Sequence, residues 1–490
     1  MKFKLRPFFK DISLTFITET IVLVAFFFIY RLIAKNFGPE GVGEYTLIKR
    51  VIAFLYPVLL LGLGIGLPRY IAMSQNKEQR SSYMKAGGLI VAVFTFIFLI
   101  FINLFKDFFA EIFFGTTNYT NLVSPFSLFL AGLILHSLVY SYFRGRLFVK
   151  TFNFLQITNL ALVPLIILIF FKDITIEKLI TLIGTITFII AFTFSLFFIK
   201  EFFIWIEKKK LKESFKELIH YSLPRLPGDF ALAGLLSLGP IFAAHFASIQ
   251  EVGYLSVSQS LLNTIGGVIA PLGIILLPKV SNLMTNGKQE IIKENLNFLI
   301  VAVGQCSIFL CVQLIIFADV VIKYWLGSEF LNAVPIMRII FSSIFFYVFY
   351  VAVRSVLDAA KIKPLNTINL FISFSVFLFV AGILLFVKIL SPIISLSLAS
   401  TLGMASLGIL TYLSIRKIYP ENPLKDLKYL FIAILINIPF VVIAVSMKSL
   451  VISKFYWLIL FEGILGIFYL VALWLLKMEW IKQIPEKVLY

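Results

Sequence analysis

Apolar runs of about 20 residues follow one another along almost the whole chain, and short polar stretches separate them. Each run is long enough for one α-helix to cross the roughly 30 Å hydrocarbon layer of a bilayer. Of the 490 residues, 60% are hydrophobic and only 14% are charged, which is far more apolar than a water-soluble protein needs. Backbone groups inside a bilayer must bond within their own segment, so the runs predict helices. The sequence therefore predicts an all-α polytopic membrane protein.

The polar breaks divide the chain into 14 expected transmembrane helices. They lie near residues 12–33, 45–73, 84–105, 122–143, 152–171, 178–199, 218–246, 253–281, 293–316, 334–357, 366–387, 392–414, 429–447 and 455–476. No small-residue cleavage site follows the first run, so we expect it to be the first helix and not a removable signal peptide.

Positive charge is distributed unevenly between the two sets of connections. If the N-terminus lies inside, each inner segment holds between two and six Lys or Arg, whereas no outer connection holds more than two. Basic loops stay on the cytoplasmic side during insertion, so both termini are expected to be cytoplasmic. The net charge of +18 then follows from membrane topology, and its short clusters do not form the basic face of a nucleic-acid-binding protein.

Prolines, glycines and polar residues recur at a fixed offset of 210 positions. The matched pairs are Gly43 and Gly253, Pro68-Arg69 and Pro278-Lys279, Asn76 and Asn286, Gln79 and Gln289, Pro125 and Pro335, Tyr140 and Tyr350, Arg144 and Arg354, and Asn159 and Asn369. The offset carries the first expected helix onto the seventh. Since six helices is an even number, the two copies point the same way, and transporters built from such parallel repeats bind their substrates between the halves.

The repeat divides the chain into four expected parts. Residues 1–200 and 218–418 are expected to form two parallel six-helix bundles, joined by a basic cytoplasmic linker at 201–217. Residues 419–490 hold two C-terminal helices, outside the repeat, and a cytoplasmic tail.

Signatures of several chemistries are absent from the sequence. No G-x-x-x-x-G-K-[ST] phosphate loop occurs, so ATP hydrolysis is not expected. His136, His220 and His245 are scattered, so neither a metal site nor a cofactor is expected. The outer connections are short and no paired-carboxylate motif occurs, which disfavours an enzyme of glycan assembly. A parallel two-bundle membrane protein without a nucleotide site is most simply a secondary transporter.

Two acids occupy matched positions in the two copies. Glu19 lies about seven residues into the first expected helix, roughly 10 Å from its start, and its repeat mate Asp229 lies in the seventh. A charge inside a span is costly and usually faces a cavity or a partner. If both acids face the central cavity, they can exchange H⁺ or help to bind Na⁺. The alternatives are local pairs, of Asp229 with Arg225 at i,i+4 and of Glu19 with an embedded arginine.

Two stretches of the chain resemble a known family. The first runs from Arg31 through Gly38-Pro39-Glu40-Gly41 to Tyr45 and then to Gly62-Leu-Gly64-Ile-Gly66-Leu-Pro68-Arg69-Tyr70. The second is Tyr221-Ser222-Leu223-Pro224-Arg225-Leu226-Pro227-Gly228. With the 14 spans and the basic central loop, they resemble the polysaccharide flippases. These are the O-antigen and repeat-unit translocases of the multidrug/oligosaccharidyl-lipid/polysaccharide (MOP) exporter superfamily.

The resemblance implies a transport function. Such a flippase moves an undecaprenyl-diphosphate-linked oligosaccharide across the cytoplasmic (inner) membrane by alternating access, coupled to an ion gradient. It implies O-antigen or lipopolysaccharide synthesis, with membrane lipids, a polysaccharide polymerase and glycosyltransferases as candidate partners. Embedded arginines would line the cavity and bind the diphosphate, because guanidinium binds phosphate bidentately and stays charged in a dry site. The candidates are Arg31, Arg50, Arg69 and Arg225.

Each of these assignments has an alternative. Arg31 and Arg50 lie near outer helix ends, where they can snorkel to the interface, and Arg69 can be a topological anchor. Gly62, Gly64 and Gly66 permit either a bend in the second helix or close helix packing. Other cargoes of the same superfamily, lipid II or the drugs of a cation antiporter, also stay open. The two C-terminal helices argue against the antiporters, which typically have twelve.

Overall fold

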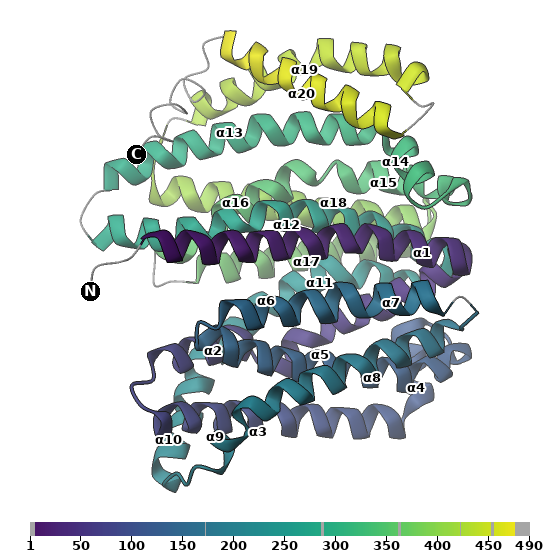
Figure 1. Cartoon of the computed structure of the whole chain (residues 1–490). Coiled ribbons are helices and arrows are strands. Elements are labelled where there is room, and N and C mark those ends of the chain that lie inside the picture. Colours follow the sequence, from purple (N-terminus) through teal and green to yellow (C-terminus); the bar gives the residue numbers. More distant parts are fainter. Residues whose placement is uncertain are drawn as a thin grey trace. The chain divides into compact units, whose positions relative to one another are not determined.

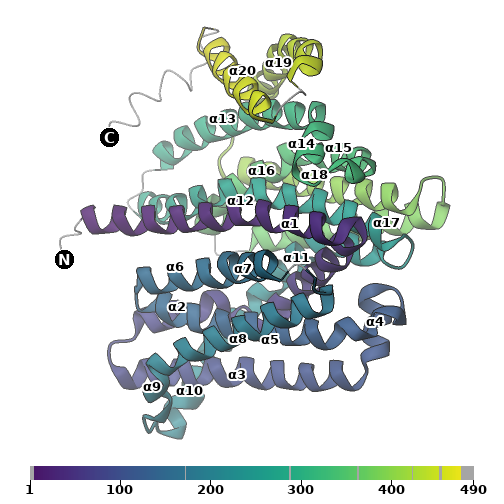
Figure 2. The same cartoon turned by 45° about the vertical axis from the view of Figure 1, so that its right-hand side comes forward.

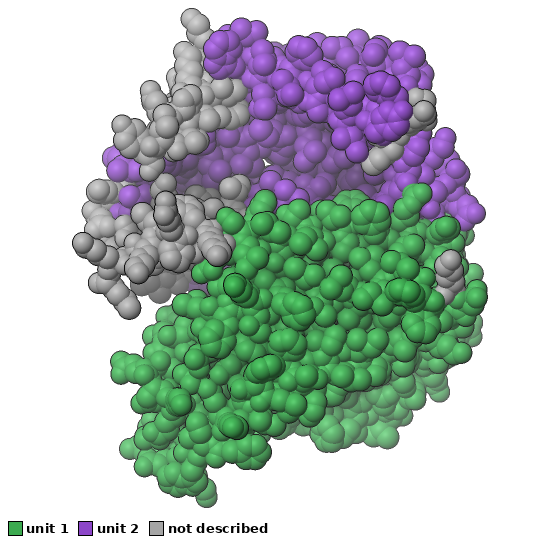
Figure 3. All heavy atoms as spheres, in the orientation of Figure 1, with its two compact units in different colours: residues 1–256 green, residues 257–490 purple. Residues whose placement is uncertain are grey.

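The computed structural model describes residues 5–171, 173–285, 289–360, 364–421, 423–451 and 455–475, and every element in them is a helix. The helices belong to two compact units, Met1–Ser256 and Val257–Tyr490 (Figure 3). The boundary between the units lies within one long helix, α12 (Ile249–Thr285). The assignment of residues 1–200 and 218–418 to two parallel bundles stays a prediction.

Unit 1 contains eleven α-helices and the start of α12 within its described residues (Figure 1). The α-helices are α1 (Leu5–Leu60), α2 (Leu63–Met73), α3 (Lys77–Leu104), α4 (Lys106–Phe114), α5 (Thr120–Gly145), α6 (Val149–Ile157), α7 (Val163–Phe170), α8 (Ile176–Ser195), α9 (Ile199–Phe203), α10 (Lys208–Ser222) and α11 (Leu226–Ala243). Shorter turns of helix join some of them: η1 (Thr117–Tyr119), the π-helical η2 (Thr158–Leu162), η3 (Leu196–Phe198) and η4 (Leu223–Arg225).

Unit 2 contains the rest of α12 and eight further α-helices within its described residues. They are α13 (Gln289–Ile316), α14 (Ala318–Trp325), α15 (Val334–Phe341), α16 (Ile344–Ala360), α17 (Leu365–Val387), α18 (Pro392–Ile418), α19 (Pro423–Val451) and α20 (Phe455–Leu475), with the 3₁₀ turn η5 (Ser328–Ala333) before α15. In both cartoon views α19 and α20 lie side by side along α13 (Figures 1 and 2).

Eleven helices in the described residues are long and apolar enough to cross a membrane, or up to twelve if the bent pair Ser328–Phe341 and Ile344–Asp358 is one span. The polytopic, all-helical expectation is confirmed at this level. Two segments account for the difference between this number of candidate spans and the 14 expected from the sequence. The segment Ser13–Leu60 takes in the first expected span and part of the second. The span expected at 253–281 falls in α12, where residues 271–279 have side chains outside the described set.

The order of the helices repeats as the residues do. An offset of 210 carries α3 onto α13, the short α4 onto α14, and α5 onto α15 with α16. The copies differ in where a helix breaks. Gly62, with φ of 72°, ends one helix before α2, whereas α12 continues through the equivalent position. The π-helical η2 likewise corresponds to a regular part of α17.

The repeat-equivalent glycines Gly43 and Gly253 lie against each other in unit 1. A Cβ on Gly253 would lie 3.0 Å from both Cα and N of Gly43, and a Cβ on Gly43 would overlap the backbone carbonyl of Ile249. Helices can approach this closely only where side chains are absent. Both copies of the repeat therefore supply glycine to one crossing, that of α1 with α12.

The segment expected as a linker lies largely in α9 and α10, and both helices pack on α3. Arg80, near the start of α3, forms an ion pair of 2.7 Å with Glu201 on α9, and the Tyr142 hydroxyl donates to the same carboxylate at 2.9 Å. Lys210 on α10 forms an exposed pair of 3.0 Å with Glu78. An ion pair that shares a carboxylate with other donors contributes more than an isolated surface pair. We infer that the Glu201 contacts hold this basic segment against the helix ends.

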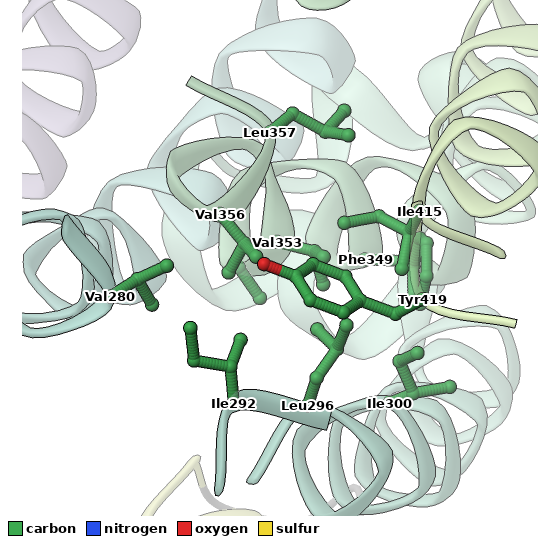
Figure 4. Close-up of a cluster of buried hydrophobic side chains, with 11 residues drawn as sticks. Val280, Ile292, Leu296, Ile300, Phe349, Val353, Val356, Leu357, Ile415 and Tyr419 are labelled. Carbon is green, nitrogen blue, oxygen red and sulfur yellow. The ribbon is translucent and has the colours of Figure 1, made fainter. Parts of the chain in front are cut away.

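The core of unit 2 forms where α13, α16 and α18 meet. Ile292, Leu296 and Ile300, spaced four residues apart on α13, pack against buried Val353 and Val356 on α16. The ring of Tyr419, just after α18, extends across the middle of this cluster (Figure 4). The four-residue spacing places the α13 side chains on one face, which is the reason that this helix buries a continuous stripe.

Candidate functional site

The two stretches that carry the family resemblance meet in unit 1. Gly62, just before α2, and Gly66, in its first turn, lie against Ser222 at the end of α10. A Cβ on Gly62 would lie 2.6 Å from the Ser222 carbonyl oxygen, and a Cβ on Gly66 would overlap the Ser222 hydroxyl. Close packing therefore explains Gly62 and Gly66, and the left-handed φ of Gly62 also breaks the helix there. Gly64 has only a 3.9 Å contact with Leu60.

This close approach places two predicted cations on one aromatic ring. The guanidinium carbon of Arg69, on α2, lies 4.4 Å from the Tyr221 ring centroid, and that of Arg225, in η4, lies 3.8 Å from it. Arg225 also donates from Nη1 to the Tyr221 carbonyl oxygen at 2.5 Å. Guanidinium groups stack on tyrosine through the ring quadrupole while their N–H edges point outward. Tyr221 thus orients both groups.

Two further tyrosines and one acid surround this ring. The Tyr70 ring lies 5.7 Å from Tyr221 and 4.9 Å from Tyr83, and the Tyr83 hydroxyl donates to Glu217 at 2.5 Å. We call Arg69, Tyr70, Tyr83, Tyr221 and Arg225 the Tyr221 cluster. The cluster lies where the sequence predicts the cytoplasmic ends of the helices.

The Tyr221 cluster has the chemistry of an anion site. Arg69 and Arg225 are exposed, and neither forms an ion pair with any described residue. Two adjacent cations without counter-ions repel each other, and an anion with several oxygen atoms relieves that repulsion. Sequence reasoning selected both arginines but not Tyr221, although Tyr221 opens the second resemblance motif. Tyr221 and Arg225 are four residues apart, about one helical turn, and this spacing is the sequence feature that indicates their contact.

Arg50 occupies a different environment from the other candidate arginines. Its side chain is only 6% exposed, and it donates from Nη1 to the Leu236 carbonyl at 2.9 Å and from Nη2 to the Ser256 carbonyl at 2.7 Å. These bonds connect α1 to α11 and α12. A buried charge held by backbone carbonyls stabilises the helix arrangement.

We expect Arg50→Ala to lower the free energy of unfolding by about 2–4 kcal/mol, because it deletes two charge-assisted bonds and leaves two buried carbonyls unpaired. Arg50→Met, which keeps the length of the side chain but not its donors, should lose nearly as much. Thermal unfolding of the purified protein in detergent measures both. A fully stable Arg50→Ala variant that no longer binds cargo would instead assign Arg50 to the cavity lining.

Glu19 on α1 belongs to a polar network with α5, α6 and η2. Gln156 forms side-chain hydrogen bonds with both Glu19 and His136, and Asn159 Nδ2 lies 2.8 Å from His136 Nδ1. The amide of Asn159 is a donor, so Nδ1 accepts and the ring proton of neutral His136 lies on Nε2. Asn159 lies in the π-helical turn η2, and such turns are frequent at functional sites. The network links two titratable side chains, and sequence reasoning had set His136 aside as isolated.

The structure distributes the remaining candidates more widely. Arg31 is exposed on α1, and Asp229, the repeat mate of Glu19, is half-buried in the first turn of α11. Helices α1 and α11 pack against each other within unit 1. In the described residues no three His, Cys, Asp or Glu side chains are grouped as a metal site would require.

Unit 2 contains an apolar cavity of about 200 Å³ between α13, α16, α18 and α19. Its lining includes Val301, Gly304, Phe345, Phe349 and Leu430, with Gln305 among the few polar residues. A cavity with this lining excludes charged ligands and accepts hydrocarbon.

Comparison with known families identifies the chain. Residues 8–284 match the model of the family described as polysaccharide biosynthesis protein, which is more than half of the sequence. The chain therefore belongs to this family, and the family assignment made from the sequence is confirmed. No curated protein matches the chain.

Solved structures show the fold. The chain is similar to a lipid II flippase MurJ in an inward closed conformation, with a TM-score of 0.70 and 17% identity over 94% of this chain and 97% of that one. It is also similar to an outward-facing multidrug resistance MATE transporter of the MOP superfamily, with a TM-score of 0.58 and 13% identity over 84% and 95%. A MOP superfamily transporter from Pyrococcus furiosus has a TM-score of 0.53 and 14% identity over 84% and 95%. The chain thus has the fold of these membrane transporters.

Proposed function

We propose that this protein is a flippase that carries an undecaprenyl-diphosphate-linked oligosaccharide, such as an O-antigen repeat unit, across the cytoplasmic membrane by alternating access. The Tyr221 cluster is the observation that carries the proposal, because it presents two unpaired guanidinium groups in a member of a polysaccharide biosynthesis family with a transporter fold. The proposal includes 14 spans in two parallel six-helix bundles plus two C-terminal helices, with both termini in the cytoplasm.

The two ends of the proposed cargo match two kinds of surface. A diphosphate needs several N–H donors and positive charge, which Arg69 and Arg225 offer. A polyprenyl chain needs apolar surface, and the cavity of about 200 Å³ lined by Val301, Phe345 and Phe349 offers apolar surface for a short part of such a chain. Because the Tyr221 cluster lies at predicted cytoplasmic helix ends, it suits the loading step, in which the diphosphate leaves the inner headgroup layer.

We assign ion coupling to the two acids Glu19 and Asp229. Glu19, bonded through Gln156 to His136, can take up a proton, and Asp229 is its counterpart in the second copy. Binding of H⁺ or Na⁺ changes the charge of the network and so changes which conformation is favoured.

Lipid II is the second candidate cargo. It is favoured by the similarity to a lipid II flippase over nearly the whole of both chains, and it shares the diphosphate that the Tyr221 cluster would bind. A cationic drug is disfavoured, because Arg69 and Arg225 would repel it.

Transport of labelled lipid-linked glycan in proteoliposomes tests the function. We expect the fraction of label that an external enzyme can reach to change with time only in vesicles that contain the protein. Either a H⁺ or a Na⁺ gradient should accelerate this change. Lipid II run in parallel separates the two cargoes. Transport of neither lipid would refute the proposal.

We expect Glu19→Gln to remove the response to the gradient, so that the ratio of rates with and without it falls to about one, since the amide cannot exchange a proton. Asp229→Asn should weaken the response as well. The matched control is Glu40→Gln, an exposed acid on the same helix, which should respond as the wild type does. An unchanged response in Glu19→Gln would make Glu19 a structural hydrogen-bond partner only.

A further inference from the structure

Helices α13, α19 and α20 of unit 2 enclose a narrow apolar seam. Its buried side chains are Phe317, Val320, Phe440, Ala444, Leu458, Leu465, Tyr469 and Leu473. The seam contains two polar side chains that the proposed function does not use, Gln313 and Glu462. Neither forms a side-chain hydrogen bond or an ion pair with any described residue.

Glu462 lies on the buried face of α20. Leu458, Leu465 and Tyr469, at i−4, i+3 and i+7 from it, are all buried, so the 3.6-residue period places Glu462 on the same stripe. Its Oε1 atom is inaccessible and has no hydrogen-bond partner among the described residues. Because Glu462 lies well inside a candidate span, Tyr456–Leu475, any part of it that is not buried by protein faces hydrocarbon or an internal space and not bulk water.

Gln313 lies on the face of α13 that turns toward α19 and α20. Phe309 at i−4, Ile316 at i+3 and Phe317 at i+4 all pack into the seam. Gln313 itself is only 4% exposed, and both its Nε2 and its Oε1 are buried without a partner in the described structure. A buried carboxamide with no bond at either end is unusual and costs about 1–3 kcal/mol per group.

Two ring contacts show that Gln313 and Glu462 lie within about one helical turn of each other along the helix axes. Phe309 stacks on Tyr469 at 4.5 Å, and Phe317 meets Phe461 edge to face at 6.1 Å. The helices therefore run antiparallel, and Gln313 lies midway between the two contacts while Glu462 lies beside the second. With a rise of 1.5 Å per residue their Cα atoms differ in height by roughly 5 Å, which two long side chains span.

Charged and titratable groups from each packed helix border the seam. They are Cys306 on α13, Asp319 and Tyr324 on α14, Tyr429 and Lys448 on α19, and Tyr469 on α20. Two cations reach this border, and both pair with Asp319. Lys448 is bound to Asp319 at 2.6 Å and to the Ile316 carbonyl at 2.8 Å, and Arg338 on α15 lies 3.9 Å from Asp319. Ionised Glu462 would therefore be a buried charge without a counter-ion, which costs several kcal/mol.

The neutral acid and the amide complement each other. A carboxylic acid has one donor and one acceptor, and so does the facing edge of a carboxamide, so the pair can form two hydrogen bonds. We propose that Glu462 and Gln313 form a proton-binding site in the seam between α13, α19 and α20, with the proton on the Glu462 carboxyl. This site is separate from the Glu19 network and lies partly on helices outside the repeat. It does not depend on which cargo the protein carries.

Carbodiimide labelling of the purified full-length protein tests the site. Dicyclohexylcarbodiimide reacts with protonated carboxyl groups that water does not reach, and mass spectrometry locates the adduct. We expect Glu462 to be labelled near neutral pH at least about tenfold more than Glu111, an exposed acid on α4, and to lose labelling as the pH rises. Labelling no greater than that of Glu111, or independent of pH, would overturn the proposal.

Two variants test whether the adduct forms on Glu462 and whether its labelling rate depends on Gln313. Glu462→Gln should remove the adduct from the α20 peptide and leave the others unchanged. If that variant does not fold, Gln313→Leu keeps the carboxyl and removes only the amide, and we expect its labelling rate to change severalfold. An unchanged rate in Gln313→Leu would overturn the pairing. The measurement needs no cargo, so its failure is distinguishable from a failure to transport glycan.

Discussion

Substitution of both Arg69 and Arg225 by alanine is expected to slow translocation of lipid-linked glycan by about two orders of magnitude or more. Each guanidinium would contribute charge-assisted hydrogen bonds to the diphosphate, of about 1.5–3 kcal/mol apiece, and the double variant loses both. The two groups lie 4.4 and 3.8 Å from one ring centroid, so under the proposal both would act on the same part of the cargo. Initial rates in proteoliposomes, together with binding of the lipid diphosphate in detergent, measure the effect.

The matched control removes the same charge from a neighbouring surface. Lys212 and Lys216 are exposed on α10, and the double variant Lys212→Ala, Lys216→Ala also lowers the net charge by two. It should transport at close to the wild-type rate. Replacing Tyr221 by Leu should reproduce part of the loss, because the arginines lose the ring that orients them, whereas Tyr221→Phe should not. Equal rates in the arginine and lysine double variants would exclude a specific anion site.

The second large effect is expected from Gly43→Ala. The new Cβ would overlap the backbone carbonyl of Ile249, and backbone atoms cannot rotate away as a side chain does. Helices α1 and α12 would have to separate, at an expected loss of about 2–4 kcal/mol in the free energy of unfolding and most of the folded yield. Fluorescence-detected size exclusion and thermal unfolding in detergent measure both quantities.

A second glycine supplies the comparison. Gly382 lies within α17, and a Cβ there would meet no atom within 4 Å. Gly382→Ala should therefore be neutral or stabilising by up to about 1 kcal/mol, since alanine favours the helix. Gly253→Ala should fall between the two, because its Cβ would lie 3.0 Å from Gly43. If Gly43→Ala were as stable as Gly382→Ala, the close crossing of α1 and α12 would be contradicted.

Several features were predictable because they depend on local pattern alone. Apolar runs determine where helices span a membrane, since the bilayer imposes one length and forbids unpaired backbone groups. The offset of 210, which pairs Gly43 with Gly253, is visible in the sequence because matched glycines, prolines and charges at one spacing are rare by chance in an apolar chain. The family was also recognisable from the stretches around Arg69 and Tyr221, which the comparison confirms.

The described residues contain 11 or up to 12 candidate spans, so the expected number of 14 stays a prediction. Within α1 two helices meet across a kink at Gly38, whose φ of 65° is not helical, so α1 includes residues from two expected spans. Helix ends within apolar sequence depend on tertiary contacts, such as the approach of Gly62 to Ser222, and no local pattern reports these.

The sequence by itself determined the class of fold, the repeat and the residue types that make up the candidate sites, because hydrophobicity and backbone chemistry act locally. Only the tertiary structure decided which of those residues act together. Arg69 and Arg225 are far apart in the chain and share Tyr221, Arg50 binds backbone carbonyls in the interior, and Glu19 reaches His136 through Gln156. Gln313 and Glu462, which we propose as partners, come near each other only when α20 packs against α13. Contacts between distant segments depend on how whole helices pack, and that information is not present in any one stretch of residues.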